Sequence, residues 1–265
     1  MIRQLIILAI LFCFWGCNNN EKERHNLPQQ ISHNDKLLLD SIAKFPDSLL
    51  LKERLIQSYR DNDDYEKAIA VTDDFLRIDS LNPRLWDIKA TLYFENEDTL
   101  NATRSLETAL QILQAPAYIM KLGSIYARTK NNKALALADT LLQGKFAHTE
   151  AEAFYIKGLY YAYAGDKTKA IGLFDRSLSV DYNYMPAYLE KAMVFYDSGK
   201  YDEAFKVLNR AVTLQNKFDE GYYWRGRCLE KLNRSGEAVE EYRMALMCSP
   251  GYTEAKEALE RLQEK

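Results

Sequence analysis

The sequence predicts an all-α solenoid, an elongated stack of antiparallel helical hairpins. The main observation is that small residues recur every 34 positions along the chain. They form two series: Gly158, Ala192, Gly226 and Ala170, Ala204, Ala238. A fixed period of this length indicates repeated helical units, each burying its apolar face against its neighbours. Such arrays present an extended concave surface and usually carry no chemistry of their own.

Each unit is predicted to contain two amphipathic helices. In residues 151–184, Phe154 and Gly158 share one face of the first helix, and Ala170 and Phe174 share one face of the second. We expect Gly158 and Ala170 to lie where the two helices come closest, because a larger side chain there would force the helices apart.

The last full unit carries a known pattern. Its sequence is GYYWRGRCLEKLNRSGEAVEEYRMALMCSP, residues 221–250, with an aromatic residue and Gly in the first helix, then Ala, an aromatic residue, Ala and a final Pro. This resembles the tetratricopeptide repeat, although Arg225 stands where Leu is usual. The resemblance implies a right-handed superhelix whose concave groove is lined by the first helix of each hairpin.

The period divides the chain into a signal, a tether, repeats and a cap. We assign 1–16 to a signal peptide, 17–33 to a flexible tether, 34–48 to a partial repeat helix and 253–265 to a capping helix. The six repeat units between them are 49–82, 83–115, 116–150, 151–184, 185–218 and 219–252.

The third unit is the least regular. Gly123 lies one residue off the period, and the second helix could align on Ala134 or on Ala136. Alignment on Ala134 reproduces the apolar spacing better, and it implies a tightened turn and a looser exit through Gly144.

The amino terminus has the features of a bacterial lipoprotein signal. Arg3 is followed by an apolar run, Leu5–Trp15, which is too short to cross a bilayer. The run ends in Gly16-Cys17, which resembles the site where such signals are cleaved and the Cys is lipidated. We therefore expect lipidation of Cys17 and an envelope location on the periplasmic or surface side, with the outer membrane favoured. An uncleaved signal anchor and an ordinary secretory signal are the alternatives.

Rotating each first helix by one residue, about 100°, from its buried face predicts the residues that face the groove. In the fourth to sixth units this set is apolar, aromatic and basic. Its members are Tyr155, Leu159, Tyr163, Leu189, Met193, Tyr196, Tyr223 and Arg227. Tyrosine and arginine are common binding hot spots, so these residues are candidates for holding an extended or helical segment of a partner protein. The alternative is that the tyrosines only pack adjacent repeats.

Composition and motifs exclude several functions. The formal net charge of −3 gives no basic excess for nucleic acid. No catalytic, metal-binding or phosphate-binding motif occurs, so we expect a non-enzyme without metal or cofactor. No first helix carries the Lys and Asn with which some family members grip chaperone C-termini. Cys228 and Cys248 lie too far apart in their hairpin for a disulfide and are predicted to be free thiols.

The predicted function is a lipid-tethered, non-catalytic adaptor that binds other envelope proteins, with a homo-oligomer left open. The alternative is a ligand- or glycan-binding accessory lipoprotein of nutrient uptake. A glycan site would expose flat tryptophan platforms. Because Trp15 lies in the signal and Trp86 has a core pattern, only Trp224 could serve.

Overall fold

The computed structural model describes residues 32–263, and all regular structure within that range is helical. The predicted all-α solenoid is confirmed, whereas the signal and Cys17 lie outside the described residues. The fourteen helices of the described range are α1 (His33–Lys44), α2 (Leu49–Asp61), α3 (Tyr65–Ile78), α4 (Pro83–Glu95), α5 (Thr99–Ile112), α6 (Pro116–Arg128), α7 (Lys133–Leu142), α8 (Glu150–Ala164), α9 (Lys167–Val180), α10 (Met185–Tyr196), α11 (Tyr201–Leu214), α12 (Asp219–Lys231), α13 (Ser235–Cys248) and α14 (Thr253–Gln263).

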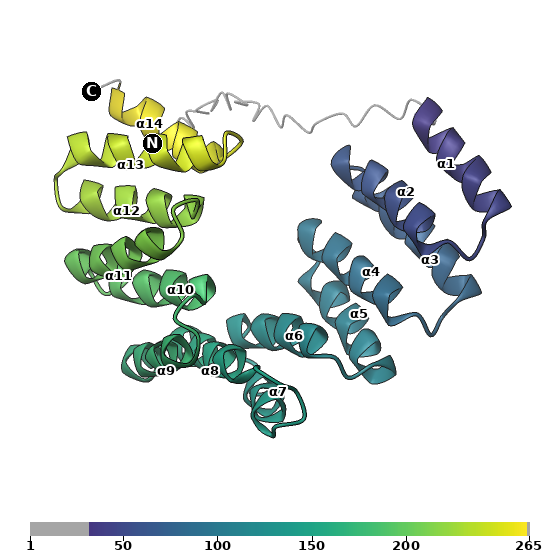
Figure 1. The fold of residues 1–265 in the computed structure, drawn as a ribbon, viewed down its shortest axis with the longest axis horizontal. Helices are drawn as coiled ribbons and strands as arrows, with labels where there is room; N and C mark the ends of the chain where they lie inside the picture. The colour runs from purple at the N-terminus through teal and green to yellow at the C-terminus, as the bar shows by residue number, and fades with distance from the viewer. Residues whose placement is uncertain (1–31, 264–265) are drawn as a thin grey trace, which may run out of the picture.

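The helices follow one another in chain order around an open arch, with α1 at one end and α14 at the other (Figure 1). Each hairpin packs its first helix on its own second helix, as α4 packs on α5 and α12 on α13. At the bottom of the arch in this view, α6 lies on the inner side and α7 on the outer side. Because each unit contacts mainly the units before and after it, stability in such a stack is built from neighbouring interfaces.

A capping residue that recurs with the period starts several second helices. Asp64, Asp98 and Asp166 each accept a hydrogen bond from the backbone amide three residues later, at 3.0–3.2 Å. This bond satisfies one of the amides that the first turn of a helix leaves without a partner. Lys200 and Arg234 occupy the same position in later units and make no such bond.

The glycines of the first helices make room for a ring of the second. A Cβ atom at Gly158 would lie 2.7 Å from the ring of Phe174, and one at Gly226 would lie 2.6 Å from the ring of Tyr242. Both rings have no exposed surface. Gly158 and Ala170 were predicted to lie where the two helices come closest. Ala170 is fully buried, and the atoms nearest to a Cβ at Gly158 belong to Phe174. The Phe174 ring fills the space beside Gly158. Phe174 follows Ala170 by four residues, so it lies on the same face of α9, one helical turn further on.

The third unit departs from this plan. Ala134 and Ala138 are fully buried while Ala136 is exposed, which confirms the alignment on Ala134. Ala138 stands where the second, fourth, fifth and sixth units carry Leu106, Phe174, Leu208 and Tyr242, and it is too small to fill the space beside Gly123. The side chain of Ile156, from α8 of the next unit, fills that space and would lie 2.9 Å from a Cβ at Gly123. Helix α6 therefore packs directly on α8.

Arg225, the departure from the family pattern, has a structural partner. Its guanidinium pairs with the carboxylate of Glu241 at 2.7 Å and lies 5.0 Å from the centre of the Phe205 ring. Both charged side chains are mostly buried. The ion pair and the ring contact let an arginine occupy a site where the family uses leucine.

Cys228 and Cys248 are both free thiols, as predicted. Cys228 is fully buried beside Ala192 and Leu208, and burial raises the pKa of its thiol to about 12. A thiol with such a pKa stays protonated near neutral pH and is a poor nucleophile.

Candidate functional site

Hollows on the face made by the first helices, within the described range, include the following three. A small polar pocket of about 200 Å³ lies between α2 and α4, and an apolar one of about 300 Å³ lies between α4 and α6. The largest of the three, about 580 Å³, lies among α10, α12 and α14. It has a volume typical of sites that bind small ligands or a few side chains of a partner.

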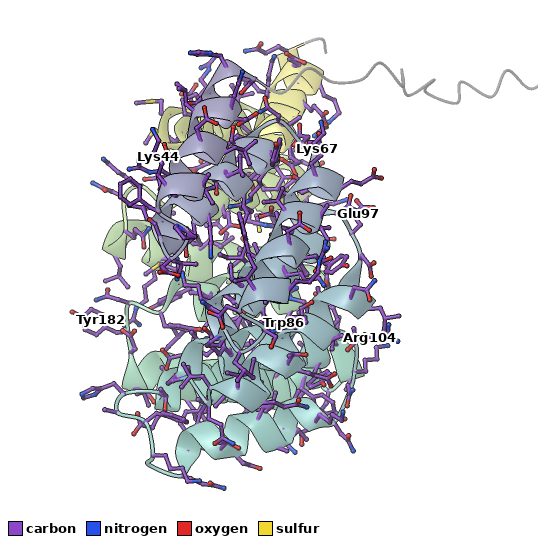
Figure 2. The ribbon with its side chains drawn as sticks, turned by 90° about the vertical axis from the view of Figure 1, so that its right-hand side faces the viewer. Lys44, Lys67, Trp86, Glu97, Arg104 and Tyr182 are labelled. Carbon is purple, nitrogen blue, oxygen red and sulfur yellow. The ribbon has the colours of Figure 1, made fainter. Side chains whose placement is uncertain are left out.

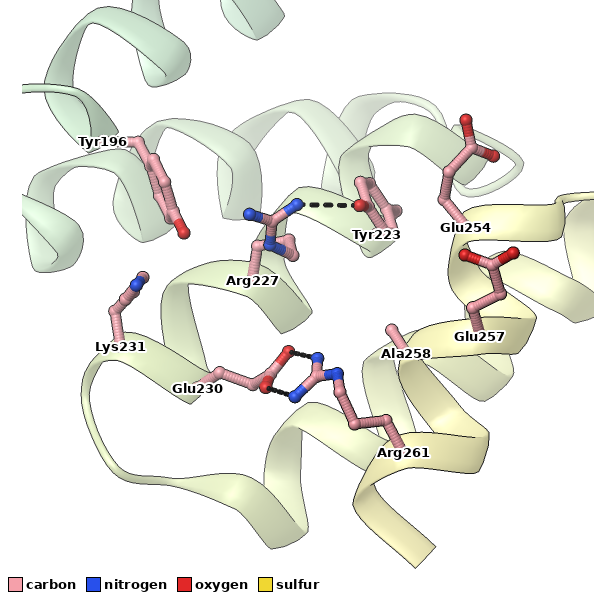
Figure 3. A pocket seen from close by; sticks show the side chains of 9 residues that line it. All are labelled: Tyr196, Tyr223, Arg227, Glu230, Lys231, Glu254, Glu257, Ala258 and Arg261. Atoms are coloured by element: carbon pink, nitrogen blue, oxygen red, sulfur yellow. Dashed lines mark hydrogen bonds and ion pairs between the residues drawn. The ribbon is translucent and has the colours of Figure 1, made fainter. Parts of the chain in front are cut away.

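We call this largest hollow the C-terminal pocket (Figure 3). Aromatic and charged side chains from three consecutive units meet in it. They are Tyr196 of α10, then Tyr223, Arg227, Glu230 and Lys231 of α12, and finally Glu254, Glu257, Ala258 and Arg261 of α14.

Arg227 lies among aromatic rings in this pocket. Its guanidinium is 5.4 Å from the centre of the Trp224 ring and 5.7 Å from that of Tyr196, and it donates a hydrogen bond to the Tyr223 hydroxyl at 2.9 Å. Burial alone would lower the pKa of the guanidinium, but the hydroxyls of Tyr223 and Tyr196 hold the pKa above its ordinary value. No carboxylate of the described residues forms an ion pair with Arg227. The site therefore presents a positive charge that remains available to a ligand.

The floor of the pocket ties α12 to α14. Arg261 donates two hydrogen bonds of 2.8 Å to the carboxylate of Glu230, and Tyr242 donates a third from below. Burial would raise the pKa of Glu230, but these bonds bring it below its ordinary value. The bidentate geometry fixes the position of α14, so the C-terminal helix is a wall of the pocket as well as a cap.

A second polar contact crosses the middle of the arch. Arg128, at the end of α6, donates hydrogen bonds to Glu190 of α10 at 2.5 Å and to the Tyr163 hydroxyl of α8 at 2.6 Å. Glu190 is only 5% exposed, and burial raises the pKa of its carboxyl although Arg128 opposes the rise. Arg128 thus links the third unit to the fourth through Tyr163 and to the fifth through Glu190.

The predicted groove residues fall into two groups. Tyr196, Tyr223 and Arg227 line the C-terminal pocket, and their role in binding stays a prediction. Leu159 has no exposed surface, so the expectation that it faces the groove was wrong.

The other predicted groove residues mainly pack against neighbouring helices and do not extend into the groove. Tyr155 is 9% exposed and contacts the ring of Tyr184, with centroids 5.4 Å apart. Tyr163, Leu189 and Met193 are half-buried and do not line the C-terminal pocket. Rotating the buried face of a first helix by one residue therefore does not predict the groove residues at the centre of the arch. There α6, α8 and α10 pack closely enough to bury the face that was predicted to line the groove.

The residues that α14 contributes to the C-terminal pocket were not predicted, although the 34-residue period indicates them. Glu257 and Arg261 lie 34 residues after Tyr223 and Arg227, so α14 has the register of a further first helix. Residues 253–265 were predicted only as a capping helix. The same rotation applied to α14 places both residues on the pocket face.

Neither tryptophan of the described residues forms an open platform. Trp86, which is labelled in Figure 2, is half-buried. Its indole N–H donates a hydrogen bond to the Ser80 carbonyl at 2.9 Å. The ring of Trp224 packs between the edges of Tyr196 and Tyr223 and carries Arg227 against it. The glycan-binding alternative expects such a platform, and it stays a prediction.

Two family models match short segments in the C-terminal half of the chain. One is described as a TPR repeat and covers residues 192–233, and the other is described as a tetratricopeptide repeat and covers residues 219–250. With the stacked hairpins and the packed glycines, these matches decide the fold. The chain folds as a tetratricopeptide-repeat solenoid. Proteins of this kind generally mediate protein–protein interactions and are typically non-catalytic scaffolds.

Solved structures show the same tetratricopeptide-repeat architecture. The chain is similar to a tetratricopeptide repeat protein from Parabacteroides merdae ATCC 43184, with 18% identity, a TM-score of 0.68 and coverage of 86% of this chain and 91% of that one. It is similar to PilW, a type IV pilus biogenesis factor, with 22% identity, a TM-score of 0.58 and coverage of 80% and 97%. Identities this low show the fold alone.

One curated protein is similar over a shorter stretch. The chain is 31% identical over 99 residues to DnaJ homolog subfamily C member 3 of Rattus norvegicus. The match covers 37% of this chain and spans a fifth of the length of that relative.

The described residues were compared with two further features, a membrane-spanning helix and a cluster of metal ligands. Among residues 32–263, no helix combines the length and the apolar character needed to cross a membrane. The same residues bring together no group of three or more His, Cys, Asp or Glu side chains suited to holding a metal ion.

Proposed function

We propose that this chain is a non-catalytic adaptor that holds a segment of a partner protein in the C-terminal pocket. The observation that carries the proposal is Arg227, a guanidinium stacked among aromatic rings in a hollow of about 580 Å³ and not paired with a carboxylate. Buried aromatic and arginine side chains that meet in one concave site are typical of binding hot spots. The floor pair of Glu230 and Arg261 keeps the site in shape before a partner arrives, which reduces the entropic cost of binding.

Filling the pocket tests this function without removing any packing. Lys231 is exposed and lines the pocket, so Lys231→Trp adds bulk at its mouth. Lys256→Trp is the matched control, because Lys256 is exposed on α14 and does not line the pocket. We expect affinity capture from detergent-solubilised envelope, read by mass spectrometry, to recover at least about tenfold less partner with Lys231→Trp, a loss of about 1.4 kcal/mol. Equal recovery by the two variants, both with native helicity, would contradict the proposal.

We also propose that the adaptor is tethered to the bacterial envelope by lipid on Cys17, on the periplasmic or surface side and with the outer membrane favoured. The support comes from the sequence alone: a basic residue, the apolar run Leu5–Trp15, and Gly16 before the cysteine. More than one acyl chain is needed for firm anchoring, since a single chain binds only marginally.

Cys17→Ala tests the tether. We expect the unsubstituted chain to sediment with membranes and to incorporate labelled fatty acid, and the variant to incorporate none. Cys13→Ala is the matched control, because Cys13 lies inside the apolar run with bulky Phe12 before it. Labelling of the Cys17→Ala variant at the level of the unsubstituted chain would reject this anchor.

A further inference from the structure

We propose that the C-terminal pocket selects a partner segment that carries an acidic and a basic side chain close together. The acidic group would lie against Arg227 and Lys231, and the basic group against Glu254 and Glu257. This inference rests on the proposed function and adds the chemistry of the partner to it. The inference rests on one observation: unpaired positive side chains line the α12 wall of the pocket, and unpaired negative side chains line the α14 wall.

The α12 wall is cationic. Arg227 and Lys231 lie one turn apart on the same face of α12, and neither pairs with a carboxylate of the described residues. The buried hydroxyl of Tyr196 raises the pKa of Arg227 but makes no hydrogen bond of normal geometry. Figure 3 shows this hydroxyl directed into the pocket near Lys231 and Arg227. Two cationic donors thus lie on one wall, beside the Tyr196 hydroxyl, and charge-assisted bonds from such donors to a carboxylate are strong.

The α14 wall is anionic. Glu254 and Glu257 lie three residues apart on α14, are exposed, and form no ion pair with the described residues. In Figure 3 they lie across the pocket from Lys231. Glu230 and Arg261 line the floor between the two walls, but they neutralise each other through their paired hydrogen bonds. The unpaired charge of the pocket is therefore positive on one wall and negative on the other.

A ligand with both charges fits this arrangement better than a ligand with one. A purely acidic segment attracted by Arg227 would meet Glu254 and Glu257, and a purely basic one would meet Arg227 and Lys231. Like charges brought together disfavour the wrong partner, which is how charge patterns give specificity. The volume of about 580 Å³ holds only a few side chains, so the acidic and basic residues must be near neighbours in the partner.

A random decapeptide display library, selected against the full chain in detergent, tests the inference. Four proteins are compared: the unsubstituted chain, Arg227→Gln/Lys231→Gln, Glu254→Gln/Glu257→Gln, and the control Glu203→Gln/Glu260→Gln. Glu203 and Glu260 are exposed and do not line the pocket. We expect peptides enriched by the unsubstituted chain and by the control to pair an acidic with a basic residue. Peptides enriched by Arg227→Gln/Lys231→Gln should lose only the preference for an acidic residue. Peptides enriched by Glu254→Gln/Glu257→Gln should lose only the preference for a basic residue.

Calorimetric titration of the most enriched peptide then measures the coupling. Replacing its acidic residue with Gln should weaken binding at least about tenfold for the unsubstituted chain but less than about twofold for Arg227→Gln/Lys231→Gln, as expected for groups in direct contact. Thermal unfolding of each protein checks that the variants are folded. Enriched peptides without a charge pattern, or the same coupling in both proteins, would overturn this inference and leave the proposed function standing. Failure of the unsubstituted chain to enrich any peptide would overturn both.

Discussion

Replacing Phe174 with alanine is expected to lower the free energy of unfolding by about 3–5 kcal/mol. The ring has no exposed surface and fills the space beside Gly158, where no other side chain can replace it. Its loss removes apolar burial and leaves a cavity between α8 and α9 at the centre of the arch. Chemical denaturation followed by circular dichroism measures the change.

The control for this prediction is Phe94→Ala. Phe94 is 54% exposed on α4, so its removal should change the free energy of unfolding by no more than about 0.5 kcal/mol. Because a solenoid is held by neighbouring interfaces, Phe174→Ala should also separate the unfolding of the two arms into distinct steps. A single transition with a loss similar to that of Phe94→Ala would show that the ring does not join the two helices.

Replacing Arg128 with methionine is expected to cost about 1–3 kcal/mol, because it leaves the carboxylate of Glu190 buried without its cation. Arg128 is itself 42% exposed in its side chain, and solvent screening keeps the cost below that of a fully buried pair. The double variant Arg128→Met/Glu190→Met should recover most of the loss, since apolar side chains replace the charges. Arg77→Met is the control, because the Arg77–Asp74 pair lies on the surface.

The loss in Arg128→Met should depend on pH in a defined direction. Burial raises the pKa of the Glu190 carboxyl, and removal of Arg128 takes away the charge that opposes the rise. A carboxyl whose pKa is higher in the folded than in the unfolded state binds its proton more readily when folded, so the deficit should shrink as the pH falls from 7.5 toward 5. A deficit that stays constant or grows over this range would show that Glu190 does not carry the effect.

Local patterns account for what could be predicted. The spacing of Gly158 and Ala170 indicates where two amphipathic helices face each other, and this depends only on residues a few turns apart. The alignment of the third unit on Ala134 was predicted for the same reason and is confirmed. The residues that face the groove were harder to predict, because a helical wheel places Leu159 beside Tyr155 without showing how closely α6, α8 and α10 pack.

The period, the residues on the buried faces and the choice of an all-α solenoid were determined by the sequence by itself. These features arise from hydrogen bonds and apolar contacts within one unit or between neighbours. Only the tertiary structure decided that Arg128 reaches Glu190 and that α14 closes a pocket around Arg227. Such contacts depend on the angle added at each unit, which accumulates along the arch, and no single repeat carries that angle in its pattern of residues.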